Sequence, residues 1–159
     1  MTHNQYETID SYLPHKAPMI LLDRVISSHA SQTICEVEVN TDGVLAPFLT
    51  DKKALPSWYF IELMAQTVGV WNGLRLKQHQ TIPKIALLLG VRRFESAITE
   101  ASLNDMITIE ANMVLFDETL SSFQCSLYIN GQAISSGNIV AYEATTEQLE
   151  IFKNKGSSL

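Results

Sequence analysis

The sequence is poor in cysteine, proline and glycine. Its 159 residues include two cysteines, five prolines and seven glycines. Cys35 and Cys125 stand far apart, so they form neither a disulfide framework nor a Cys-x-x-Cys zinc motif. We therefore expect no metal site and a reducing compartment, and the composition excludes collagen-like and low-complexity chains.

Basic residues and long hydrophobic runs are also scarce. Lys and Arg number 11 against 17 Asp and Glu, which gives a net charge of -6. General nucleic-acid binding is not expected, because it requires a net basic face. The longest apolar stretch, Trp58 to Trp71, is too short to span a bilayer and is interrupted by Glu62 and Gln66. With a polar N-terminus that resembles no signal peptide, we expect a cytoplasmic protein without a membrane span.

The remaining composition is that of a folded chain. Hydrophobic residues make up 46% and charged residues 18% of the sequence, and the length fits one domain with a substantial core. We expect a single domain over residues 1–159. Its core runs from about residue 8 to 145, followed by a polar C-terminal tail over 146–159.

Hydrophobic patterning predicts six strands and one long helix. The strand segments are Met19–Ser28, Gln32–Val39, Ile85–Phe94, Met106–Phe116, Leu120–Ile129 and Gln132–Glu143. A short helix is predicted over 8–12, and Asn130-Gly131 predicts a tight hairpin turn. The long helix begins at Pro56-Ser57 and is apolar on all sides, which is typical of a core helix.

This element order predicts an α+β fold in which an antiparallel sheet wraps around one buried helix. One face of a sheet cannot cover such a helix completely. We therefore expect a dimer that completes its burial.

Glu62 fits its apolar setting least well. It lies in the first turns of the long helix, and Gln66 follows four residues later on the same face. Burial disfavours the charged form of a carboxyl group, which would make Glu62 a proton-donating acid. The alternative is a carboxylate that reaches water or caps a backbone amide. At the helix start, the backbone N–H groups of Ser57 and Trp58 are expected to hold a developing oxyanion, or to be capped in the ordinary way.

His15 is the histidine in the most restrained setting, between Pro14 and Pro18. A restrained imidazole can serve as a general base near neutral pH. Local spacing alone favours the alternative, a structural histidine bonded to the backbone.

Several basic side chains are expected to form a rim that attracts an acidic carrier protein. They are Arg75, Lys77, Lys84, Arg92 and Arg93. Arg92 and Arg93 are adjacent, so a regular strand would place them on opposite faces. Solvated surface charge is the alternative interpretation of this set.

Two segments resemble the signatures of a known family. Residues 13–25 read LPHKAPMILLDRV and residues 62–66 read ELMAQ, and both resemble motifs of the FabZ-type 3-hydroxyacyl-ACP dehydratases. The resemblance implies a hotdog fold and dimers with sites at the subunit interface. It also implies a substrate held on the phosphopantetheine of acyl carrier protein, with no metal or redox cofactor.

One element of that family is missing. FabZ-type enzymes carry a catalytic histidine in a G-H-F-P-G element before the helix, whereas this chain has no histidine between His29 and His79. Phe48 lies close to the vacant place. The combination is most similar to the ApeP-like branch of aryl polyene biosynthesis.

The resemblance leaves three functions open. In the first, the chain dehydrates a 3-hydroxyacyl thioester to a trans-2-enoyl thioester, with His15 as base and Glu62 as acid. Ser57, Trp58 and Gln66 would then bind the thioester. In the second, the chain is the non-catalytic or weakly active subunit of a hotdog heterodimer. In the third, it is a thioesterase that uses Glu62.

Overall fold

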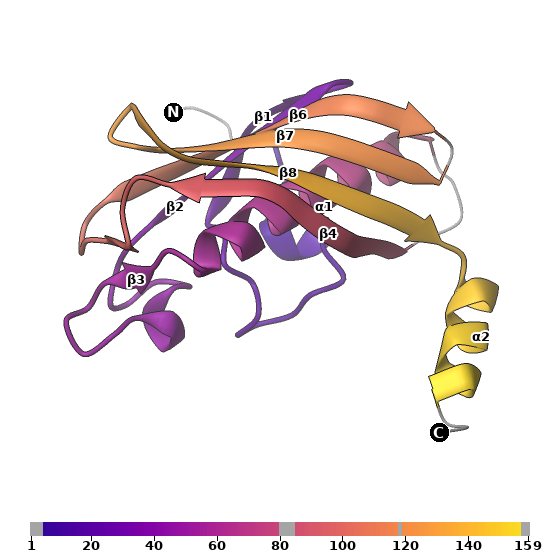
Figure 1. Ribbon diagram of the computed structural model, residues 1–159, viewed down its shortest axis with the longest axis horizontal. Coiled ribbons are helices and arrows are strands. Elements are labelled where there is room, and N and C mark those ends of the chain that lie inside the picture. The colour runs from indigo at the N-terminus through magenta and orange to yellow at the C-terminus, as the bar shows by residue number, and fades with distance from the viewer. Residues whose placement is uncertain (1–4, 80–84, 118, 157–159) are drawn as a thin grey trace.

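The main feature of the computed structural model is a six-stranded antiparallel sheet that curves around one helix (Figure 1). The model describes residues 5–79, 85–117 and 119–156. The strands follow the order β1-β2-β6-β7-β8-β4 across the sheet. They are β1 (Arg24–His29), β2 (Gln32–Glu38), β4 (Ile85–Ser96), β6 (Met106–Asp117), β7 (Leu120–Ile129) and β8 (Gln132–Ala144). The predicted α+β fold is confirmed.

The helix inside the sheet is α1 (Tyr59–His79). It packs against β2, β4, β6, β7 and β8, and side chains such as Phe60, Leu63 and Met64 are fully buried. The helix starts two residues after Ser57, because Ser57 lies in a turn in which its carbonyl accepts the Phe60 N–H. Burial against the concave face of the sheet fixes which side of α1 remains open for a site.

Two predictions at the sheet margins have different outcomes. Asn130 and Gly131 have φ angles of 52° and 82°, the two positive values that a tight type I′ hairpin requires, so the predicted β7–β8 turn is confirmed. The strand expected from Met19 begins only at Arg24. The backbone before it is held elsewhere, because the Leu21 N–H donates to a side chain of α1.

Several short elements complete the fold, and some of them were not predicted. The loop before α1 holds the short helix η2 (Ala46–Phe48), and β3 (Leu55–Pro56) pairs with β5 (Glu100–Ala101) in a second, two-stranded sheet. The short helix expected over 8–12 is the single turn η1 (Ile9–Ser11). All of these lie around the beginning of α1 or against it, where the candidate site is found.

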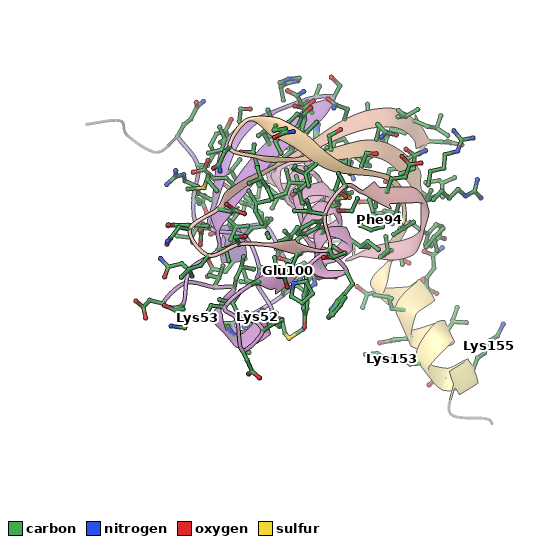
Figure 2. All side chains as sticks on the ribbon, turned by 60° about the vertical axis from the view of Figure 1, so that its left-hand side comes forward. Lys52, Lys53, Phe94, Glu100, Lys153 and Lys155 are labelled. Carbon is green, nitrogen blue, oxygen red and sulfur yellow. The ribbon has the colours of Figure 1, made fainter. Side chains whose placement is uncertain are left out.

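In the polar tail expected over 146–159, residues 146–156 form the helix α2 (Thr146–Gly156), which was not predicted. The Thr145 hydroxyl accepts the Gln148 backbone N–H, and the Gln148 side-chain Oε1 accepts the Thr145 backbone N–H. This reciprocal pair is a capping box. Figure 2 shows Lys153 and Lys155 on this helix, which stands clear of the sheet. Within the described part of the chain, no helix is long and apolar enough to cross a membrane.

The N-terminal segment crosses α1 at two glycines. A Cβ built on Gly73 would lie 2.1 Å from the Tyr12 carbonyl oxygen, whereas one on Gly69 would meet only the Leu13 Cδ2 at 2.8 Å. The backbone of Tyr12 cannot move without moving the segment, but the end of a leucine side chain can rotate. Gly73 therefore allows the segment that carries His15 to lie directly on the helix.

Gly73→Ala is expected to lower the free energy of unfolding by about 1–3 kcal/mol, the usual cost of overpacking. Gly69→Ala is the matched control, since it makes the same exchange in the same helix and gains the same helix propensity. Urea denaturation followed by circular dichroism measures both. Equal midpoints for the two variants would contradict the close approach of Tyr12 to α1.

Candidate functional site

The structure brings two of the predicted site residues together. The His15 Nε2 lies 3.9 Å from the Glu62 Oε1. Glu62 projects from the first turns of α1, and His15 lies on the segment between η1 and β1. An imidazole and a carboxyl group at this distance form a potential acid–base pair.

Gln66 forms hydrogen bonds with Glu62 and with the segment that follows His15. Its side chain is 1% exposed. The Oε1 accepts the Leu21 N–H at 2.9 Å, and the Nε2 donates to the Met19 carbonyl at 2.8 Å and to the Glu62 Oε1 at 2.9 Å. The predicted contact between Glu62 and Gln66 is confirmed, and the same amide also fastens the segment that follows His15.

Within one chain Glu62 is only partly buried, as in the alternative of a carboxylate that reaches water. Its side chain is 42% exposed and that of His15 is 37% exposed, because the sheet covers other faces of α1. Both groups are therefore accessible in the single chain. The His15 Nδ1, in contrast, is buried and has no hydrogen-bond partner among the described residues, so Nε2 is the ring nitrogen that faces the site.

The predicted oxyanion donors are only partly available. The Ser57 N–H donates to the Thr99 carbonyl at 2.9 Å, so it is not free to bind a substrate. Thr99 precedes β5, whose pairing with β3 places that carbonyl next to Ser57. The following residue, Trp58, has a side chain that is 67% exposed, and no described residue takes up its backbone N–H.

Two residues of the predicted basic rim, Arg75 and Lys77, form contacts within the chain instead. The Arg75 guanidinium donates to Glu143 at 2.7 Å and to Asn72 at 2.9 Å, and it lies over the rings of Trp71 and Phe116. Because Glu143 is buried, this ion pair joins α1 to β8 and is unavailable to a partner.

Lys77 is also engaged within the chain. Its ammonium donates to the Glu7 carboxylate at 2.8 Å and lies over the ring of Tyr12. The same hydrogen bond lowers the pKa of the Glu7 carboxyl. Lys77 therefore ties the N-terminal segment to α1.

Other basic side chains remain exposed. Arg92 and Arg93 are both exposed, but a break in the β4–β8 register and a φ of 52° at Arg93 end the regular alternation that would separate them. Lys84 lies outside the described residues. Figure 2 shows Lys52 and Lys53 together on the loop before β3, near Glu100. These two exposed lysines were not among the predicted rim residues, although they are adjacent in the sequence.

A cleft of about 590 Å³ opens beside His15. It lies between the N-terminal segment and the loop before α1, and its walls include Ile9, Leu13, His15, Ile20, Val44 and Pro47. Of the two residues of the pair, His15 lines this cleft and Glu62 does not. The resemblance of residues 13–25 to the FabZ motif was the sequence feature that predicted a site here. Val44 and Pro47 are apolar, and nothing in their chemistry indicates a site.

The place of the missing family histidine is apolar. Phe48 packs against Tyr59 with ring centroids 5.3 Å apart, and the Phe48 ring carries no group that could take a proton. Burial raises the pKa of the Cys35 and Cys125 thiols to about 12, so neither forms a nucleophilic thiolate near neutral pH. In the described ranges, no group of three or more His, Cys, Asp or Glu is arranged to hold a metal ion.

Known proteins with similar sequences are dehydratases. FabZ 3-hydroxyacyl-[acyl-carrier-protein] dehydratase of Acinetobacter baylyi is 22% identical over 146 residues, which cover 89% of this chain and 96% of the relative. The enzyme of the same name from Bartonella quintana is 25% identical over 138 residues, with 85% and 86% covered.

Solved structures agree on the fold. The dehydratase heterocomplex ApeI:P from Xenorhabdus doucetiae contains a chain that is 34% identical, with a TM-score of 0.90 and coverage of 94% of this chain and 99% of that one. A hypothetical thioesterase from Streptococcus pneumoniae has a TM-score of 0.58 at 12% identity, covering 76% and 86%. At that identity the likeness concerns the fold alone.

The family model described as ApeP-like, ApeP dehydratase, matches residues 7–153. This match spans nearly the whole chain and agrees with both the FabZ relatives and the hotdog architecture. The chain therefore belongs to the ApeP-like dehydratases, a family related to the FabZ 3-hydroxyacyl-[acyl-carrier-protein] dehydratases.

Proposed function

We propose that His15 and Glu62 together remove water from a 3-hydroxyacyl thioester carried by acyl carrier protein. The observation that carries the proposal is the 3.9 Å approach of the His15 Nε2 to the Glu62 Oε1 in an open site. Dehydration needs one group that takes a proton and one that gives a proton, at neighbouring carbon atoms. This pair provides both within one chain.

The proposed steps balance without a redox change. The C2–H bond breaks and its proton goes to the His15 Nε2, while the released electron pair forms the C2=C3 double bond. The C3–O bond breaks as the oxygen takes the proton of Glu62 and leaves as water. The resulting imidazolium and carboxylate are neighbours and attract each other. Return of the proton from His15 to Glu62 restores the site, so the cycle calls for no metal or redox cofactor.

Binding of the thioester would use the surfaces beside the pair. The Trp58 N–H lies at the positive end of α1, which favours negative charge developing on the thioester oxygen. The cleft next to His15 offers space for a part of the substrate away from the reacting carbons. Acyl carrier protein, as an acidic partner, would meet the exposed basic side chains of Arg92, Arg93, Lys52 and Lys53.

Mass spectrometry of a 3-hydroxyacyl-carrier protein incubated with the purified chain tests the function. Loss of one water from the carrier-bound acyl group is the expected result. Release of the acyl group as free acid would instead identify a thioesterase. An unchanged carrier would contradict independent activity of this chain.

A second candidate function is that of a subunit whose partner supplies the base. Two observations favour it. The buried Nδ1 of His15 has no acceptor among the described residues, although a base that acts through Nε2 carries its own proton on Nδ1. The edge strand β4 also exposes Leu88 and Leu89, and an open edge of this kind is a template for pairing with another sheet.

The heterocomplex of the similar Xenorhabdus doucetiae chain supports this alternative. Co-expression with a second hotdog chain and the same mass-spectrometric assay distinguish the two. Turnover by the complex, with none by this chain alone, would favour the subunit. A stable homodimer with its own turnover would exclude it.

A further inference from the structure

Gln66 uses both of its amide protons inside the protein. One goes to the Met19 carbonyl and the other to the Glu62 Oε1, while its oxygen accepts the Leu21 N–H. A glutamine amide has two donor hydrogens, so none is left for a substrate. The substrate-binding role expected from the sequence is therefore wrong, and the residue must contribute in another way.

The surroundings permit one orientation of this amide. Turning it by 180° would place the NH₂ group against the Leu21 N–H and the oxygen against the Met19 carbonyl. Two donors would then face each other, as would two acceptors, in a setting where Gln66 is 1% exposed. Buried polar groups without partners cost about 1–3 kcal/mol each. The backbone of the His15 segment thus fixes the Nε2 toward Glu62.

This orientation distinguishes the two oxygens of Glu62. Because the Oε1 accepts the Gln66 N–H, the proton of a neutral Glu62 belongs on the Oε2. No described residue forms a hydrogen bond with that oxygen. The proton is therefore presented on the oxygen that remains free to meet a substrate hydroxyl.

We propose that Gln66 is the positioning residue of the dehydration site. It holds Glu62 with its proton on the Oε2, and it ties the segment that carries His15 to α1, which sets the distance between acid and base. The inference rests on the proposed function, since it assigns Gln66 a task in that reaction.

Two substitutions of Gln66 test its two roles, the positioning of Glu62 and the attachment of the His15 segment to α1. Gln66→Met has a similar length and removes all three hydrogen bonds. We expect kcat to fall about 10- to 100-fold with little change in KM, since a displacement of about 1 Å can cost a factor of this size. We also expect faster hydrogen exchange of the Leu21 amide.

Gln66→Glu keeps an acceptor for the Leu21 N–H but places a second carboxyl group against Glu62. The N–H that Gln66 donates to the Glu62 Oε1 is lost in this variant. We therefore expect kcat to fall again, with little change in KM.

Asn72→Leu is the matched control, because Asn72 is another buried amide of α1 and contacts Arg75 rather than the site. Its kcat is expected to match that of the unaltered protein. Faster Leu21 exchange with unchanged kcat would show that Gln66 has a structural role only and would overturn the proposal. An unchanged kcat in Gln66→Glu would do the same, provided that Glu62→Gln is inactive. An active Glu62→Gln would overturn the proposed function itself.

Discussion

Glu62→Gln is expected to lower the rate of dehydration by about 10²- to 10⁴-fold, the usual contribution of a positioned proton donor. Glutamine has the same size and its oxygen can still accept the Gln66 N–H, so the site keeps its shape. The amide cannot give a proton to the leaving hydroxyl, which must then depart as hydroxide. Single-turnover mass spectrometry of the carrier-bound product measures the loss.

The matched control for this substitution is Glu110→Gln on β6. Glu110 also accepts an amide N–H, from Asn112 at 2.7 Å, but it lies on the sheet rather than on α1. We expect that variant to retain full turnover. Equal activity of the two variants would show that Glu62 gives no proton in the reaction.

The local part of this site was predictable because it follows from helical periodicity. Glu62 and Gln66 are four residues apart, and any helix there brings their side chains together. The capping box of α2 was equally local, since Thr145 and Gln148 have the required types and spacing. This cap was not predicted, because the polarity of residues 146–159 indicated a tail.

Contacts that join distant segments were not predictable in the same way. The acceptor of the Ser57 N–H is Thr99, and the partner of Arg75 is Glu143. Nothing near either residue indicates these partners, because sheet registration far along the chain decides them. For His15, local spacing favoured a structural role, and only the resemblance of residues 13–25 to a dehydratase motif suggested that it would approach Glu62.

The exposure of Glu62 depends on which faces of α1 the sheet covers. The hydrophobic pattern of the helix does not identify those faces. One sheet was expected to leave part of the apolar helix uncovered, and in α1 the open part coincides with the carboxyl group of Glu62. The same opening faces His15. A substrate or a partner surface could cover a site that is half-exposed within one chain. This exposure agrees with a hotdog assembly.

His15→Gln is expected to lower dehydration about 10²- to 10⁴-fold if the imidazole is the base that takes the C2 proton. The glutamine amide has no basic nitrogen and cannot take the C2 proton. Single-turnover mass spectrometry of the carrier-bound product measures the loss.

The double variant His15→Gln/Glu62→Gln gives the sharper test. Groups that act as a unit show strongly non-additive losses, so the double variant should be little slower than the slower single variant. A His15→Gln variant with full activity would place the base elsewhere. If that activity then depends on a second hotdog chain, Glu62 gives the proton here while the partner takes the other.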